Sequence, residues 1–298
     1  MQIINTCKPE TYVQFIYISL DTTEGKECVG HWIWECSFFI QDIKKVKQKH
    51  GLTVKILLNT KKTYKLNILS DFGFNESDIV YSNTMSTHNT GGDNWNLNYV
   101  IPEEEEYILL IPSFFYLWKT TINSEIFFNK VAEFRKYYID NLPEISKTTP
   151  ITYISRSQKE NYSRNNREFI NFKDFRNLMC EKNVNILDTD TLSSLTPQFH
   201  TVLSSKVIIV EAGSAFTINC AFIASNSHII LINDIHGYYN SSNYEWFIVL
   251  RILLESRNNT VEIFSTGDKT NNNTPFSVDL NRMSEKIDII RSLYNLDN

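Results

Sequence analysis

The stretch VIIVEAGSAFTINCAF (Val207–Phe222) joins an unbroken apolar run to a helical pattern through one short turn. A continuous apolar run predicts a strand that is buried on both faces, as in a parallel sheet covered by helices. Gly213 lets the backbone approach a ligand closely, and Ser214 can cap a helix whose N-terminus carries partial positive charge. The turn therefore indicates an anion site, although the same connection is common in proteins without one.

The second half of the chain repeats this alternation of apolar runs and helical patterns. Strands are predicted at 151–155, 184–187, 206–210 and 228–232, and helices at 172–183, 191–205 and 217–225. Strands that alternate with helices predict a parallel α/β sheet. After the polar segment 266–275, an amphipathic helix at 283–296 is the last predicted element, and we expect it to pack back across both halves of the chain.

The first half also mixes the two kinds of element. Strands are predicted at 12–20, 54–58, 78–82 and 107–112, and helices at 32–49, 64–74 and 123–142. The segment Pro143–Pro150 has a proline at each end and no periodicity, which predicts a boundary between domains 1–147 and 148–298. We expect two doubly wound α/β domains that face each other across a cleft, with ligands outside the carboxyl ends of the strands.

Bulk composition narrows the class of protein. A formal net charge of −5 argues against a dedicated nucleic-acid binder, because binding to phosphates needs a basic face. The cysteines have no metal-ligand spacing and predict reduced thiols of a cytoplasmic protein. The N-terminus has no signal-peptide pattern, and no apolar run approaches the ~20 residues of a membrane span. Peripheral membrane attachment stays open.

A cluster of arginines follows the strand predicted at 151–155. Arg156 comes directly after it, and Arg164 and Arg167 lie in the polar segment beyond. The planar guanidinium group binds phosphate oxygens in pairs and stays charged at physiological pH, so the cluster suits a diphosphate. A solvated surface loop is the alternative interpretation, especially for Arg164 and Arg167. Glu211, at the end of its own strand, is a candidate for contacts with sugar hydroxyls.

The stretch VGHWIWECSFF (29–39) places His31 and Glu35 four residues apart on a predicted helix, so that they share a face. That face is offset by one residue from the apolar stripe of Trp32, Cys36 and Phe39, which is expected to anchor the helix. An imidazole that a carboxylate orients and makes more basic can act as a general base. Periodicity alone favours the other interpretation, a structural pair at the start of a helix.

Other polar motifs favour structural interpretations. Asp188–Asp190 (DTD) has the form of a divalent-metal motif, but its place between a strand and a helix favours a helix cap. Glu103–Glu106 reads as a solvated turn. The histidines at 88, 200, 228 and 236 have no metal-ligand spacing, so no metal site is predicted.

The His31–Glu35 stretch, the arginine cluster and the Gly213–Ser214 turn occur in this order along the chain. In this they resemble the motifs of glycosyltransferase family 61, whose members transfer sugars from nucleotide-sugar donors. Residues 30–47 resemble the family's Gly/Asn-His-Trp/Phe-x-x-Glu motif, which contains His31 and Glu35. Segments 54–80 and 107–115 are similar to the strands that follow that motif. In the second half, segments 151–171 and 188–224 match further family motifs at Arg156, Arg164, Glu168, Gln198, Gly213, Ser214 and Asn219. The family's usual histidine before the glycine is absent here, where the chain reads Glu211-Ala212-Gly213.

The resemblance implies an inverting glycosyltransferase of the GT-B type, with two Rossmann-like domains facing a cleft. Domain 148–298 would bind the donor and domain 1–147 the acceptor, a hydroxyl of a glycan or glycolipid. Arg156 and the Gly213–Ser214 turn would stabilise the leaving diphosphate, and the His31–Glu35 pair would supply the base, with the proton acceptor of the two left open. The expected co-substrate is a nucleotide sugar, first of all a UDP-sugar, with no metal and a hexosyl or pentosyl group transferred.

Two other functions fit the same architecture. One is another glycan-modifying transferase, such as a pyruvyltransferase. The other is a non-catalytic nucleotide-sugar or glycan-binding protein, which the missing family histidine keeps open.

Overall fold

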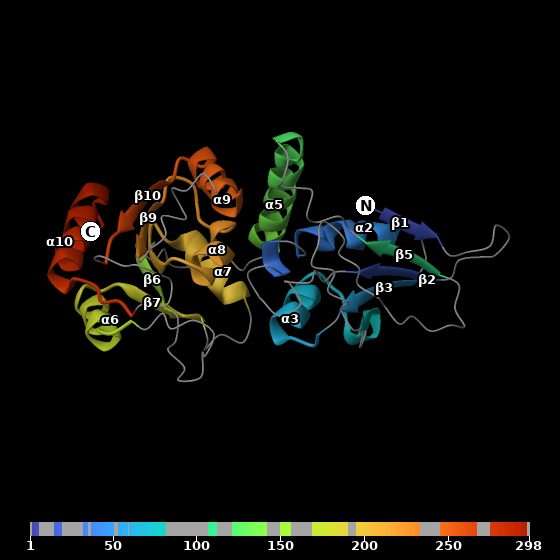
Figure 1. Cartoon of the computed structure of the whole chain (residues 1–298), viewed down its shortest axis with the longest axis horizontal. Coiled ribbons are helices and arrows are strands. Elements are labelled where there is room, and N and C mark those ends of the chain that lie inside the picture. Colours follow the sequence, from blue (N-terminus) through green and yellow to red (C-terminus); the bar gives the residue numbers. More distant parts are fainter. Residues whose placement is uncertain are drawn as a thin grey trace. The chain divides into compact units, whose positions relative to one another are not determined.

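The computed structural model describes residues 2–5, 15–19, 32–34, 37–50, 53–58, 60–81, 107–111, 121–141, 150–155, 169–189, 195–232, 245–266 and 275–296. The chain divides into two compact units, Met1–Asp140 and Asn141–Asn298. Each unit contains a five-stranded sheet with mainly parallel strands. Figure 1 shows both sheets as arrows among helices. The predicted mixed α/β class with parallel sheets is therefore confirmed.

In the first unit the strands lie in the order β1-β5-β2-β3-β4. The four predicted strands are present as β2 (Phe15–Ser19), β3 (Thr53–Leu58), β4 (Ile79–Tyr81) and β5 (Tyr107–Ile111), all parallel to their neighbours in this group. Sequence reasoning missed β1 (Gln2–Asn5), a short strand that pairs antiparallel with β5 at the sheet edge. The helices of this unit are α2 (Ile40–His50), α3 (Thr63–Asp71) and α5 (Thr121–Asn141), with short 3₁₀ turns η1 (Ser37–Phe39) and η2 (Glu76–Asp78).

The predicted continuous helix at 32–49 is wrong in its first part. Residues 32–34 are helical, but Ser37–Phe39 form η1 and α2 begins only at Ile40. The Ser37 hydroxyl donates to the Ile33 carbonyl oxygen at 2.7 Å, a local bond that competes with the helical ladder. Trp32, Ile33 and Trp34 are all buried, whereas Phe39 is only partly buried. Three consecutive side chains, which point in different directions from the backbone, are thus buried. Residues 32–34 therefore do not present a single apolar stripe.

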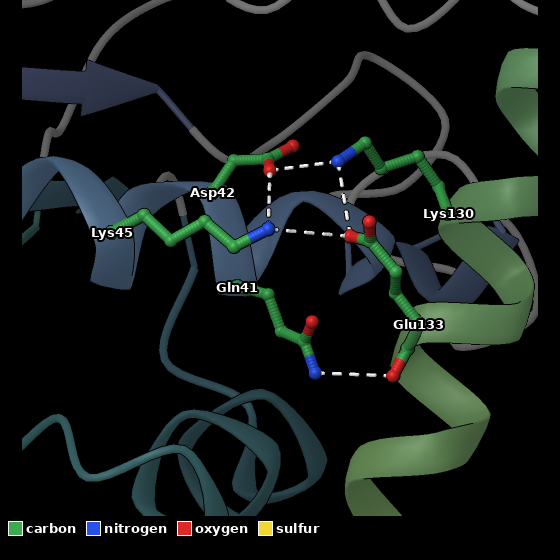
Figure 2. A network of polar contacts seen from close by, with 5 residues as sticks. All are labelled: Gln41, Asp42, Lys45, Lys130 and Glu133. Atoms are coloured by element: carbon green, nitrogen blue, oxygen red, sulfur yellow. Dashed lines mark hydrogen bonds and ion pairs between the residues drawn. The ribbon is translucent and has the colours of Figure 1, made fainter.

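Helix α5 is held on α2 by polar contacts from four charged side chains and one amide, shown in Figure 2. Lys130 Nζ donates to Asp42 Oδ1 at 2.7 Å and to Glu133 Oε2 at 3.1 Å. Lys45 Nζ completes the ring, at 3.8 Å from Asp42 Oδ1 and 3.5 Å from Glu133 Oε2. Gln41 adds a hydrogen bond to the Glu133 carbonyl oxygen at 3.1 Å. Partial burial lowers the pKa of Lys130, but the two carboxylates outweigh it and the net shift is upward.

In the second unit all neighbouring strands are parallel, in the order β10-β9-β8-β6-β7. Four of them were predicted: β6 (Ile151–Ser155), β7 (Asn185–Asp188), β8 (Val207–Glu211) and β9 (His228–Ile232). Every residue of β6, β8 and β9 is buried, as expected for strands covered on both faces. Sequence reasoning missed β10 (Thr260–Phe264) and α9 (Glu245–Ser256).

Helices lie on both sides of this sheet (Figure 1). One face packs on α6 (Phe172–Glu181) and α10 (Leu280–Tyr294), through residues such as Tyr153, Ile209 and Ile232 of the strands. In Figure 1, α7 (Thr196–Ser204), α8 (Ser214–Cys220) and α9 lie on the other side of the strands. The buried side chains of α10 pack within this unit, and its predicted return to the first unit stays a prediction. None of the described helices combines the length and apolar character that a bilayer crossing requires.

Candidate functional site

The chain changes direction across the second sheet between β6 and β8. From β6 it moves outward to β7, returns to β8 on the other side of β6, and continues outward to β9 and β10. Ligands of open parallel sheets bind outside the carboxyl ends of the strands at such a point, because the connecting segments diverge there. Ser155 ends β6 and Glu211 ends β8, and these neighbouring strands pair in register up to Ile154 and Val210. The candidate site is therefore this edge of the sheet.

Glu211 lies on the face of the sheet that α6 and α10 cover. Its Oε1 accepts a hydrogen bond from the Tyr153 hydroxyl at 3.3 Å, and the two residues are 7% and 0% exposed. Burial, reinforced by the charge of Glu211, raises the pKa of Tyr153 well above its ordinary value, so the tyrosine stays a neutral donor. The Glu211 carboxylate is thus positioned by a hydrogen bond from a buried tyrosine. Its predicted contact with sugar hydroxyls stays a prediction.

Arg176 ties together the ends of two neighbouring strands. One of its guanidinium nitrogens donates to Asp188 Oδ2 at 2.9 Å and to the Ser155 hydroxyl at 3.3 Å. The Thr189 hydroxyl adds a bond to the Ser155 carbonyl oxygen at 3.3 Å. Ser155 is the residue before Arg156, so these contacts fix the backbone from which the arginine segment departs.

Asp188, which was expected to cap the following helix, does not cap α7. Helix α7 begins at Thr196 after Leu195, five residues later than predicted, and Asp188 ends β7 in an ion pair with Arg176. Asp190 lies outside the described residues. Among the residues that the structure describes, no group of three or more histidine, cysteine or acidic side chains could hold a metal ion.

The turn after β8 needs glycine at position 213. Gly213 has φ 125° and ψ −150°, a backbone conformation that is essentially limited to glycine. The Ala212 N–H donates to the Ile232 carbonyl oxygen at 2.8 Å, and the Thr217 N–H to the Gly213 carbonyl oxygen at 2.9 Å. Helix α8 therefore begins at Ser214, three residues earlier than predicted. The side chain of Ser214 lies outside the described residues.

Gln198 and Asn219, both predicted to contact the donor, contact each other. Gln198 Nε2 donates to Asn219 Oδ1 at 2.9 Å, and Asn219 Nδ2 donates to the Ala215 carbonyl oxygen at 2.7 Å. The two residues are 2% and 0% exposed. They join α7 to α8 and so hold the helix that follows the Gly213 turn. A direct contact of either amide with the donor stays a prediction.

The other predicted site residues lie outside the described residues: His31, Glu35, Arg156, Arg164 and Glu168. The segment that carries the three donor candidates among them is anchored at both ends. Ser155 is fully buried at its start. At its end, the Phe169 ring stacks on Phe276 with centroids 4.6 Å apart, and the Ile170 N–H donates to the Phe276 carbonyl oxygen at 2.8 Å.

Sequence reasoning missed three residues of this edge: Tyr153, Ser155 and Arg176. A signal existed for the first two, since Tyr153 and Ser155 lie two positions apart in the strand ITYIS and so point to one face. Arg176 gave no signal, because an arginine on an amphipathic helix usually faces solvent.

Comparison with known families agrees with the order of these motifs along the chain. Residues 29–230 match the family described as Glycosyltransferase 61. The chain belongs to this family. The match includes every candidate residue from His31 to Asn219 and covers more than half of the 298 residues. No curated protein matches the chain.

Membership of glycosyltransferase family 61 confirms the resemblance that the motifs indicated. It supports glycosyltransferase activity, and therefore an enzyme that uses a sugar donor and an acceptor.

Proposed function

We propose that this family 61 protein is an inverting transferase that uses a nucleotide sugar, and that the donor diphosphate binds at the carboxyl ends of β6 and β8. The observation that carries the proposal is the change of chain direction between these two strands. Arg156 follows Ser155 directly, and the glycine turn follows β8 two residues after Glu211. A two-domain GT-B architecture of Rossmann-like halves is part of the proposal, and the division into two units, each with a sheet of mainly parallel strands, supports it.

The residues at this edge suit an anionic donor. Arg156 and Arg164 would bind the phosphate oxygens and neutralise the charge that develops on the leaving diphosphate. The backbone at Gly213 has no side chain to keep phosphate away. Arg176 and Asp188 would hold the end of β6 in place, and Gln198 and Asn219 would hold α8. Glu168 and Glu211 are the candidates for contacts with donor hydroxyls.

The acceptor would be activated by the pair His31 and Glu35 of the first unit. In a single displacement the acceptor oxygen forms a bond to the anomeric carbon as the bond from that carbon to the diphosphate oxygen breaks. The acceptor proton passes to the base, and the leaving diphosphate keeps the electron pair. Bringing the two substrates together in one closed site would supply much of the rate.

The proposed donor is a UDP-sugar and the acceptor a hydroxyl of a glycan or glycolipid, without a requirement for metal. A hexosyl or pentosyl group would be transferred. We place the protein in the cytoplasm, with peripheral contact to a membrane where the acceptor is a lipid.

A thermal-shift screen of UDP, GDP, CMP and TDP tests the donor site, because a ligand that binds only the folded state raises its melting temperature. We expect a shift with UDP that Arg156→Ala abolishes. Arg282→Ala is the matched control, since Arg282 is an exposed arginine on α10, and should keep the shift. The absence of a shift with every nucleotide would overturn the assignment. UDP binding without acceptor-dependent release of UDP would favour the binding-protein alternative.

A further inference from the structure

Arg135 lies in the second half of α5 and has no partner of opposite charge among the residues that the structure describes. The other charged side chains of this stretch are paired. Lys130 and Glu133 pair with each other and with α2, as Figure 2 shows. Lys136 pairs with Asp140, and its Nζ lies 2.7 Å from Asp140 Oδ2. For Arg135, burial alone lowers the pKa of the guanidinium group, because no nearby charge acts on it within the described part of the chain.

The guanidinium group of Arg135 lies partly in the interior and partly at the surface. Its Nε nitrogen is buried and has no hydrogen-bond acceptor, whereas the side chain as a whole is only partly buried. The two terminal nitrogens keep accessible surface, so a ligand can reach them. Partial removal of a charge from water costs free energy, and arginine stays charged at physiological pH. The fold therefore holds an uncompensated cation at an accessible position.

Neighbouring groups do not supply the missing negative charge. Tyr138, about one turn further along α5, donates its hydroxyl to Asp71 Oδ2 at 2.8 Å, and that carboxylate makes no contribution to the pKa of Arg135. The partial negative charge at the C-terminus of α5 acts within the last turn, and Arg135 lies before that turn. The charge of Arg135 is thus left for a group that is not part of the described fold.

We propose that Arg135 binds an oxyanion, a phosphate or a carboxylate, and that the acceptor carries this anion. A guanidinium group binds two oxygens of such an anion through parallel hydrogen bonds, and partial exclusion of water strengthens the attraction. A charge that lowers stability while the site is empty contributes to affinity once the ligand pairs with it. The acceptor as the carrier rests on the proposed function, which assigns the first unit to the acceptor, whereas the anion site itself does not.

The melting temperature of the ligand-free protein gives the first test. Lys136→Met is the matched control, because Lys136 is the next residue of α5 and its side chain is 74% exposed in a surface ion pair that contributes little. In a chloride buffer without phosphate or carboxylate, Arg135→Met should melt no lower than Lys136→Met, since a flexible apolar side chain replaces a charge that has no partner. A lower melting temperature of Arg135→Met would show that the chain itself pairs Arg135, and would overturn the proposal.

Thermal shifts with inorganic phosphate, D-glucuronate and neutral D-glucose test the ligand, at constant ionic strength. All proteins in this test carry Arg156→Ala, so that phosphate binding by the proposed donor arginine does not contribute. At about ten times its Kd, a bound anion should raise the melting temperature by about 3–6 °C. Arg135→Met should abolish this shift, Lys136→Met should keep it, and glucose should give none.

The two anions distinguish the kinds of acceptor. A shift with phosphate alone indicates a phosphorylated acceptor, and a shift with glucuronate indicates an acidic sugar. No shift with either anion, or an equal shift with Arg135→Met, would overturn the anion site. The UDP screen on the wild-type protein tests the proposed function separately. If UDP gives no shift but the anion shift depends on Arg135, the anion site stands and its assignment to the acceptor is contradicted.

Discussion

Replacing Gly213 by alanine tests the turn that joins β8 to α8. At φ 125° and ψ −150° an added Cβ is strained, at a cost of about 1–3 kcal/mol. The smaller conformational freedom of alanine in the unfolded chain returns about 0.4–1 kcal/mol. We therefore expect a net loss of about 1–2 kcal/mol in the free energy of unfolding. For a unit of this size, that lowers the melting temperature by about 2–8 °C.

The glycine at position 73 provides a matched control for this change. Gly73 also has positive φ, 84°, and a Cβ added there would meet no atom within 4 Å. Gly73→Ala should therefore carry backbone strain of about 1–2 kcal/mol in the first unit, with no effect on the donor site. Urea denaturation measures both losses, and the UDP thermal shift should disappear only in Gly213→Ala. Unchanged stability of Gly213→Ala would refute the strain argument, and an unchanged UDP shift would refute the placement of phosphate at this turn.

Two further changes test buried polar groups of the second unit. Tyr153→Phe removes the hydroxyl that donates to the buried Glu211. It should lower the free energy of unfolding by about 1–3 kcal/mol in a urea denaturation at pH 7. A loss of under about 0.5 kcal/mol would show that this bond contributes little. Burial lowers the pKa of His228, and Glu262, whose Oε2 lies 3.4 Å from His228 Nε2, offsets only part of the shift. The unfolded state then binds the proton more readily than the folded state. The contribution of His228 to the free energy of unfolding should therefore be constant above a pH of about 6.5 and decrease as the pH drops below it. His228→Gln should reduce this fall between pH 7 and pH 5, and an equal fall in both proteins would contradict it.

The sequence predicts the centre of each sheet better than its edges. β6 and β9 appear at the predicted residues because each is a short run that is buried along its whole length and rich in isoleucine, with turn-forming or polar residues on either side. β10 escaped prediction because TVEIF lies at an edge, where most of its residues are partly exposed and the apolar run is broken. Around Trp32–Trp34 the core surrounds the chain, so a single helical stripe was the wrong pattern to seek.

The sequence predicts which residue types belong to the site, but it does not predict which of them contact each other. Glycine at 213 was predicted from its place between an apolar run and a helix, and the backbone there does require glycine. The contact between Tyr153 and Glu211 joins residues 58 positions apart, and that between Gln198 and Asn219 joins residues 21 apart. Such contacts depend on which strands and helices are neighbours, and periodicity along the chain does not specify neighbours.

The stacked rings of Phe169 and Phe276 have a consequence for any shortened form of the protein. Asn171 reinforces them, since its side chain donates to the Val278 carbonyl oxygen at 2.8 Å and accepts from the Val278 N–H at 3.0 Å. The amide side chain thus pairs with the backbone of a residue 107 positions later, as a neighbouring strand would. The stretch before α10, which contains Phe276 and Val278, therefore holds the residues that follow the arginine-bearing segment 156–168. A fragment that stops after β10 would keep the five strands of the second sheet. It would still lose the contacts of Phe169 and Asn171 with Phe276 and Val278.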